Sequence, residues 1–171
     1  MKLTLEAFTP SLAAWWQESR GDPESVRYNP FAPSTLEQLR ERLAKASADL
    51  ADFPRSEAFL WVIRVDGELV GHVSIQQINR MMLTAELGYA VSASARGKGV
   101  ATQAVRMVMR DCFTRTPLRK LVAFVHEDNV PSRRVLEKVG FRLEGLLREH
   151  FLVGGAPANE AIYGILRGDL E

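Results

Sequence analysis

The chain has 171 residues, of which 46% are hydrophobic and 25% are charged, which fits one globular domain with a sizeable core. Its 22 basic and 21 acidic side chains give a net charge of +1, which does not favour a general binder of nucleic acids. Because Cys112 is the single cysteine, the composition excludes an internal disulfide and a cysteine-based metal cluster.

The sequence carries no sign of export or of membrane insertion. Residues 1–10 contain no long apolar run, which predicts the absence of a signal peptide. No run of about 18 apolar residues occurs, so we expect no transmembrane helix and no membrane partner. With one cysteine the chain is predicted to be cytoplasmic. No spacing of His, Asp and Glu resembles a metal site, so we expect no metal.

The chain begins with a predicted strand and a predicted helix. Residues 2–8 alternate between polar and apolar side chains, as a half-buried strand does. A helix is predicted over residues 10–20, where a proline opens the first turn. Trp15 and Trp16 in this helix either line a groove for a substrate or pack on the core. Residues 21–33 contain three prolines and are expected to form a loop with short turns.

A second helix is predicted over residues 34–46. Ser34 and Glu37 have the spacing of a capping box at its start. Three leucines spaced at helical intervals form one apolar face, and the charged face opposite is assigned to solvent.

Three strands then follow one another. Residues 59–65 and 68–78 flank Asp66-Gly67, which is a strong signal for a hairpin. Residues 83–91 form the third strand. The helix that follows, residues 99–113, has one apolar face that includes Cys112, whose thiol is predicted to be buried and inert.

The last third predicts a strand, a short helix and two closing strands. Residues 120–125 are continuously apolar, as in a strand covered on both faces. The helix of residues 131–139 ends at Gly140. Residues 141–153 and 159–168 are paired around a Gly-Gly-Ala-Pro turn.

These elements predict a single α/β (α+β) domain over residues 1–171, with the order βααβββαβαββ and a mixed sheet of about seven strands. The unit from 83 to 125 is a strand, a crossover helix and a strand. Such strands are parallel with a right-handed crossover, and ligands tend to bind at their carboxyl ends. Two polar loops, 92–98 and 126–129, fall at that edge.

One of these loops has the features of a phosphate-binding turn. Gly97 and Gly99 let a ligand approach the backbone, while Arg96 and Lys98 add positive charge just before a helix N-terminus. The turn is not a P-loop, because Gly97-Lys98-Gly99 does not supply that pattern. It is not a dinucleotide fingerprint either, because Thr102 stands where a glycine or alanine is required.

The stretch ARGKGVAT resembles the R/Q-x-x-G-x-G/A turn of the GNAT (GCN5-related) N-acetyltransferases. The segment HEDNVPSRRVLEKVGF is similar to that family's N-x-x-S…E-K-x-G-F segment. The stretch TAELGYAVSASARGKGVATQAV resembles the RimJ/RimL branch, which acetylates protein N-termini. The resemblance covers nearly the whole chain and implies the GNAT fold with acetyl-coenzyme A as cosubstrate.

The resemblance also implies residues that hold the coenzyme. The backbone of the turn would bind the pyrophosphate, and Thr102 would add a hydroxyl; the turn consists of Arg96, Gly97, Lys98, Gly99, Val100 and Ala101. Backbone groups of Val91 would pair with the pantetheine arm. Asn129 would bond the same arm, or else cap the next helix. Arg133 would meet the coenzyme phosphates, or solvent.

Acetyl transfer to an amine needs a base for the amine and an acid for the thiolate that leaves. Glu86 is the predicted base, because it lies among apolar neighbours on a central strand, where burial raises a carboxyl pKa. Glu149 is the reserve. The tyrosine that many family members use as the acid is replaced here by Leu136, so Ser132 is implied in that role.

The predicted function is direct acetyl transfer to a primary amine in a ternary complex. The favoured acceptor is a protein N-terminal α-amine of the ribosomal-protein type, whose pKa near 8 needs only a modest base. A small amine (a polyamine, an amino acid or an aminoglycoside) and a non-catalytic sensor of coenzyme A are the alternatives. We expect no direct nucleic-acid partner, and a monomer or homodimer.

Overall fold

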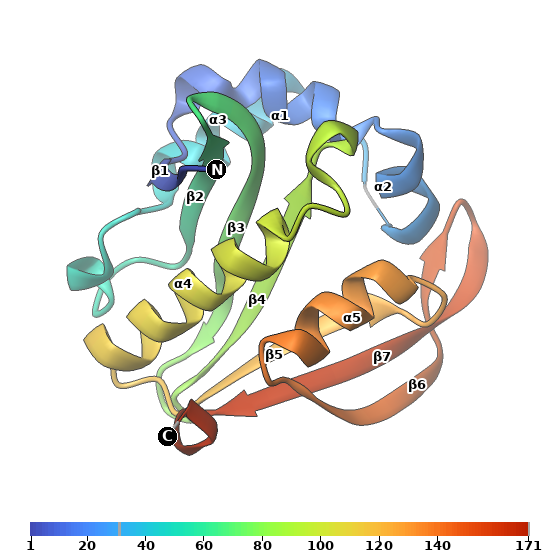
Figure 1. The fold of residues 1–171 in the computed structure, drawn as a ribbon. Helices are drawn as coiled ribbons and strands as arrows, with labels where there is room; N and C mark the ends of the chain where they lie inside the picture. The colour runs from blue at the N-terminus through green and yellow to red at the C-terminus, as the bar shows by residue number, and fades with distance from the viewer. Residues whose placement is uncertain (31, 171) are drawn as a thin grey trace.

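The computed structural model describes residues 1–30 and 32–170, and within them seven strands form one mixed sheet (Figure 1). The strand order is β1-β2-β3-β4-β5-β7-β6. The strands are β1 (Leu3–Ala7), β2 (Phe59–Val65), β3 (Glu68–Asn79), β4 (Thr84–Val91), β5 (Lys120–His126), β6 (Arg142–Val153) and β7 (Ala156–Leu166). Only β4 and β5 are parallel, which confirms the predicted crossover unit and the mixed sheet.

Helices cover both faces of the sheet. They are α1 (Ala13–Arg20), α2 (Pro23–Tyr28), α3 (Leu36–Lys45), α4 (Val100–Arg115) and α5 (Val130–Lys138). In Figure 1, α4 and α5 lie in front of the sheet. The apolar side chains of α4 and α5 form the larger core, and those of α1 and α3 form a second core against β2. We call the two sides the α4 face and the α1 face.

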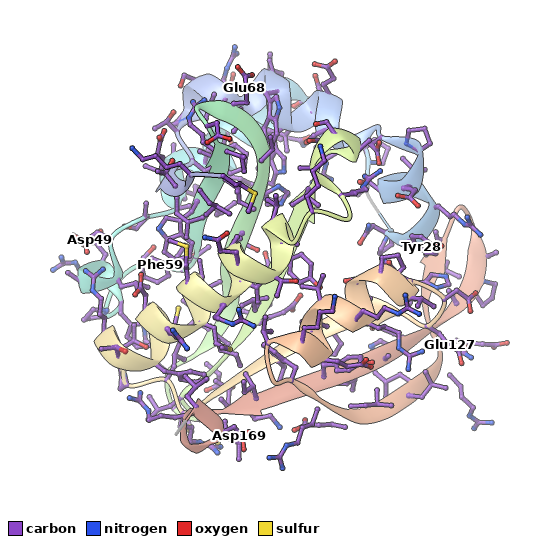
Figure 2. The ribbon with its side chains drawn as sticks, viewed as in Figure 1. Tyr28, Asp49, Phe59, Glu68, Glu127 and Asp169 are labelled. Atoms are coloured by element: carbon purple, nitrogen blue, oxygen red, sulfur yellow. The ribbon has the colours of Figure 1, made fainter. Side chains whose placement is uncertain are left out.

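The alternation along β2 explains the two cores. Phe59, Trp61 and Ile63 are buried on the α4 face, and Figure 2 labels Phe59 beside α4. Leu60 and Val62, which point the other way, are buried against α1 and α3. A strand that is apolar at both parities is therefore covered on both sides.

The segment 21–33 was predicted to be a loop, and this was wrong in part because α2 occupies Pro23–Tyr28. Asp22 caps this helix by accepting a hydrogen bond from the Ser25 amide at 3.1 Å. Pro23 stands in the first turn of α2, where a backbone amide would have no partner within the helix, so a proline costs no hydrogen bond there. Pro23 therefore marks a helix start rather than a loop, and Phe31 lies outside the described residues.

The predicted capping box is displaced by one residue. Thr35, not Ser34, accepts from the Gln38 amide at 3.2 Å, and the Gln38 side chain accepts from the Thr35 amide at 2.9 Å. Two adjacent residue pairs offer similar chemistry here, and spacing alone does not separate them. The helix predicted over residues 10–20 is α1, and a 3-10 turn at Pro10–Leu12 precedes it.

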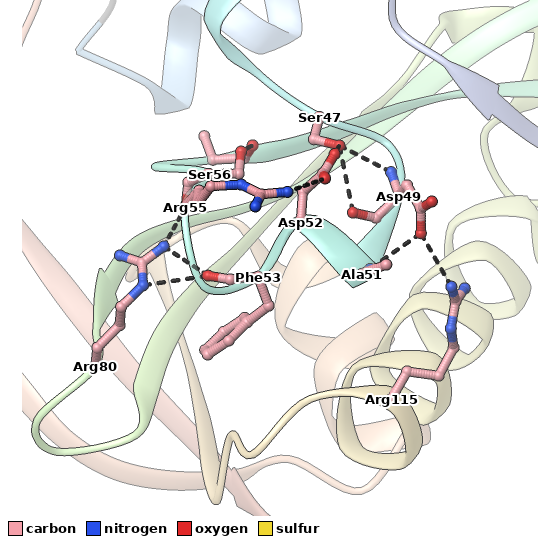
Figure 3. A network of polar contacts seen from close by, with 10 residues as sticks. Ser47, Asp49, Ala51, Asp52, Phe53, Arg55, Ser56, Arg80 and Arg115 are labelled. Carbon is pink, nitrogen blue, oxygen red and sulfur yellow. Dashed lines mark hydrogen bonds and ion pairs between the residues drawn. The ribbon is translucent and has the colours of Figure 1, made fainter.

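The segment between α3 and β2 is tied to the rest of the molecule by polar contacts (Figure 3). The Ser47 hydroxyl donates to Asp52 at 2.7 Å, and Arg80 donates to the Phe53 carbonyl at 2.8 Å. Arg115 at the end of α4 pairs with Asp49 at 3.1 Å. These contacts hold the C-terminal end of α4 against the segment that leads into β2. The predicted phosphate-binding turn lies at the opposite end of α4.

Within the described residues, none of the helices combines the length and the apolar character that crossing a membrane requires.

Candidate active site

The two parallel strands separate where the predicted ligand edge lies. β4 and β5 pair only from Thr84 and Lys120 to Glu86 and Val122. Beyond these pairs the strands diverge, as Figure 1 shows. A cavity of about 250 Å3 follows the gap, with walls formed by the second half of β4 and by residues 123–126 of β5. The backbone of β4 thus presents an unpaired edge to this cavity.

The turn after β4 has the backbone that the sequence predicts for an anion site. Gly97 and Gly99 have φ of +73° and +77°, in the left-handed region, and a Cβ at either would meet open space. Gly99 is the residue before α4, and the first amide bonded into the helix is that of Gln103, which donates to the Gly99 carbonyl at 3.0 Å. The amides of the first turn therefore lack partners within the helix.

The other residues of the turn divide into buried and exposed ones. The side chains of Val100 and Ala101 are buried beneath the helix start, so a ligand would meet only their backbone. Thr102 is half-buried, and Lys98 is exposed with no ion pair among the described residues. Val91 lines a second cavity of about 320 Å3 between α1 and the turn. The turn itself is open to a phosphate group.

The charge of Arg96 is engaged within the protein. Its guanidinium pairs with Asp22 at 2.5 Å and with Glu24 at 2.9 Å, both at the start of α2. This hydrogen bond lowers the pKa of the Asp22 carboxyl. Arg96 therefore joins the turn to α2. Because two carboxylates compensate its positive charge, Arg96 attracts a phosphate less strongly than the sequence alone suggests.

Because side chains alternate along β4, Glu86 and Tyr89 point to opposite faces of the sheet. Glu86 pairs in register with Gln76 and points to the α1 face. Tyr89 pairs with the buried Val73 and points to the α4 face, where α5 lies. Groups from both sides of the sheet therefore meet the same gap between β4 and β5.

Glu86 has the environment expected of a weak base. Burial raises the pKa of its carboxyl, and the Gln76 amide, which donates to it at 3.4 Å, opposes this shift. Glu86 lines the cavity, whereas Glu149 is exposed on β6 and is not among the lining residues. Geometry favours Glu86 over the reserve candidate.

Ser132 lies at the start of α5 and is paired with a tyrosine that the sequence analysis did not single out. The Tyr89 hydroxyl is 2.8 Å from Ser132 Oγ and donates to the Ser132 carbonyl at 2.9 Å. Burial raises the pKa of Tyr89 above its usual range, so the hydroxyl stays protonated. Both side chains line the cavity. The alternation of Ala85, Leu87 and Tyr89 was the available signal, because it places Tyr89 on the packed face.

Asn129 and Arg133 are both used by the fold itself. Asn129 Oδ1 accepts from the Ser132 amide at 3.2 Å, which confirms the capping alternative, and it also lines the cavity. Arg133 donates to the Tyr163 hydroxyl and to the Glu127 carbonyl, each at 3.0 Å. These bonds account for the Arg133 side chain without a coenzyme phosphate. Leu136 is buried and lines the cavity, as a packing residue.

The α1 face of the cavity carries one aromatic and several polar side chains. Trp16 is buried against α3, which confirms packing for one member of the tryptophan pair. Arg20, Arg42 and His72 line the cavity beside it. Nothing in the local sequence marks these three, because they come from α1, α3 and β3 and meet only in the fold.

Cys112 is fully buried in α4, as predicted from the apolar face. Burial raises the pKa of its thiol to about 12, so the thiol is neutral at physiological pH.

Comparison with protein families and curated proteins gives consistent matches. The model of the acetyltransferase (GNAT) domain matches residues 2–142. The probable N-acetyltransferase YjcK of Bacillus subtilis is 39% identical over 107 residues, 62% of this chain and 59% of that protein. The spermidine N(1)-acetyltransferase of Escherichia coli is 34% identical over 99 residues, 58% of this chain and 53% of that protein. Each match thus spans less than two thirds of the relative's own length.

Among solved structures, Mycobacterium smegmatis RimJ in complex with CoA-disulfide has a TM-score of 0.84 at 29% identity. The superposition covers 98% of this chain and 83% of that one. The agreement confirms the fold that the sequence predicts, including the mixed sheet and its flanking helices.

Proposed function

The chain belongs to the GNAT acetyltransferase family, and from this premise we propose that it transfers the acetyl group of acetyl-coenzyme A to the N-terminal α-amine of a protein. The single observation that carries the proposal is the gap between β4 and β5. This gap opens beside an anion-binding turn and receives a carboxylate from one face of the sheet and a hydroxyl pair from the other. We further propose that residues 1–171 act as one domain of the RimJ/RimL branch.

The residues around the turn fit the coenzyme. Left-handed glycines with open space above them and unpartnered amides at the start of α4 suit a pyrophosphate. The unpaired edge of β4, ending at Val91, suits an extended amide-containing arm that adds to the sheet. The coenzyme supplies a thioester, whose carbonyl carbon accepts the amine.

Proton movement is divided between the two faces. The amine nitrogen forms a bond to the thioester carbon, and the carbon–sulfur bond breaks. Glu86 takes the proton that the amine loses, directly or through water, because its raised pKa gives it the strength to do so. Ser132 gives a proton to the sulfur. Tyr89 holds the Ser132 side chain in place, and the products are an N-acetylated amine and free coenzyme A.

Two observations bear on the acceptor. The similarity to RimJ supports the protein N-terminus that the RimJ/RimL resemblance implies, but the fold does not separate the two acceptors, since a spermidine N-acetyltransferase of Vibrio cholerae superposes over 99% of this chain with a TM-score of 0.83. The sequence similarity to a spermidine N(1)-acetyltransferase supports the second candidate, a polyamine.

The test is an assay of free thiol release from acetyl-coenzyme A, with the product identified by mass spectrometry. We expect acetylation of peptides with free N-termini and none of the same peptides with blocked N-termini. Turnover with spermidine alone would support the second candidate. Binding of coenzyme A without turnover of any amine would overturn the enzyme assignment in favour of a sensor.

A further inference from the structure

Two arginines on the α1 face share one aromatic ring at the wall of the cavity. The guanidinium carbon of Arg42 lies 4.8 Å from the Trp16 ring centroid, and that of Arg20 lies 5.7 Å from it. Trp16 belongs to α1 and is buried against residues of α3 and β2, so its indole ring is held rigidly. The ring fixes two positive groups that come from different helices.

The two charges act on each other and on a neighbouring histidine. Burial lowers the pKa of Arg20, and the positive charge of Arg42 lowers it further. Burial lowers the pKa of His72 to about 4, and both arginines add to the effect. The ring of His72 is therefore neutral at physiological pH, and its Nδ1 is buried without a hydrogen-bond partner. This corner of the cavity is polar and positive.

The described lining of the cavity contains little negative charge. Glu86 is the one acidic residue among those that line the cavity. Arg42 forms no ion pair among the described residues. By contrast, Arg40 on the same helix pairs with Glu37 at 3.7 Å and does not line the cavity. The arginines and the proposed base lie on the same face of the sheet, where a second substrate would enter.

We propose that the acceptor carries an anionic group close to its amine, and that Arg20 and Arg42 bind this group while the amine faces Glu86. For a peptide acceptor the group is the carboxylate of Asp or Glu next to the N-terminal residue; a free amino acid offers the same chemistry. The inference rests on the proposed function. It disfavours polyamines, whose further positive charges would face the arginines.

The experiment compares peptides that share the same N-terminal residue and differ only at the second, which is Glu, Gln or Lys. Free glutamate and spermidine are further acceptors. We expect kcat/KM for the Glu peptide to exceed that for the Gln peptide by about 10- to 150-fold, the effect of one charge-assisted hydrogen bond. The Lys peptide and spermidine should be poorer still. Preference for free glutamate would assign the anion to a small molecule, and preference for the Glu peptide to a protein.

Variants then test whether the arginines cause the preference. Arg42→Gln should reduce the preference for the Glu peptide over the Gln peptide, because only Arg20 remains, and Arg42→Glu should shift the preference toward the Lys peptide. Arg40→Gln is the matched control and should leave the preference unchanged. Because Arg42 is exposed, these variants should fold, which thermal melting checks. The affinity for coenzyme A should stay the same in Arg42→Gln.

Several results would overturn the inference. Equal kcat/KM for the Glu and Gln peptides in the wild type, or a preference that is undiminished in Arg42→Gln, would show that the arginines do not bind the acceptor. Loss of coenzyme affinity in Arg42→Gln would assign them to the donor. Efficient turnover of spermidine would refute the inference and leave acetyl transfer intact, whereas failure with every amine would refute the proposed function itself.

Discussion

Replacing Gly99 with alanine separates the anion-binding role of the turn from its role in folding. Gly99 has φ of +77°, and a Cβ there would meet no atom within 4 Å. The substitution therefore causes no clash, and its cost is the strain of an L-residue in the left-handed region, about 1–2 kcal/mol. For a chain of this size this strain lowers the melting temperature by roughly 2–8 °C.

The chain offers a matched control in Gly67, in the turn between β2 and β3. Its φ is +88°, and a Cβ there would also meet nothing within 4 Å. Gly67→Ala should cost the same stability as Gly99→Ala. Only Gly99 lies next to the amides that would hold a phosphate, so only Gly99→Ala should weaken coenzyme binding. The loss of one charge-assisted hydrogen bond weakens binding by about 10- to 150-fold.

The assay is titration calorimetry with coenzyme A on both variants, together with thermal melting. Equal melting temperatures with unequal coenzyme affinities would support the turn as the phosphate site. The reasoning fails if Gly99→Ala binds coenzyme A as the wild type does, or if Gly67→Ala loses as much affinity.

Further predictions concern the groups in the gap between β4 and β5. Burial raises the folded pKa of Glu86 above its ordinary 4.5, so the acidic limb of kcat/KM should lie above that pH, and Gln76→Leu should move it higher. Glu86→Gln should cut turnover by about 100- to 10,000-fold, because it removes the proposed base. The same variant should melt at a higher temperature at neutral pH, because the raised pKa means that the ionised Glu86 carboxylate destabilises the fold once the pH exceeds that pKa. Tyr89→Phe should lower kcat by less than Ser132→Ala does, with coenzyme affinity unchanged in both; equal loss of affinity would make the pair a binding element. Cys112 should resist alkylation in the folded protein, and rapid labelling would contradict its burial.

Patterns within single elements predicted most of the fold, because each depends on neighbours a few residues apart. Asp66-Gly67 marked the turn between β2 and β3, where both residues adopt positive φ. The apolar run at β5 marked the strand correctly, but its predicted cover on both faces was wrong, because Leu121 and Ala123 are buried whereas Phe124 on the other face is 39% exposed. The element α2 was missed because proline is common both in loops and in the first turns of helices, and only the Asp22 cap shows that Pro23 begins a helix.

The site was harder to predict where its residues come from distant segments. Glu86, Ser132 and the turn at 96–102 each carried a local signal, and all lie at the gap or beside it. Arg20 and Arg42 had none, because a charged residue on an amphipathic helix looks the same whether it faces solvent or a cavity. The partner of Ser132 likewise became evident only when α5 was placed over β4.

The register of β4 links the fold to the chemistry more tightly than any single residue does. Glu86 and Tyr89 are three residues apart and therefore point to opposite faces, so the base and the hydroxyl pair meet the gap from two sides. A slip of one residue would exchange the faces and bury the carboxylate against α4 and α5. An irregularity between Gln76 and Asn79 of β3, where Gln77 has φ of +50°, shifts the pairing of β3 with the start of β4 by one residue. From Gln76–Glu86 to Gly71–Val91 the two strands keep one register, and this register determines which face receives the base.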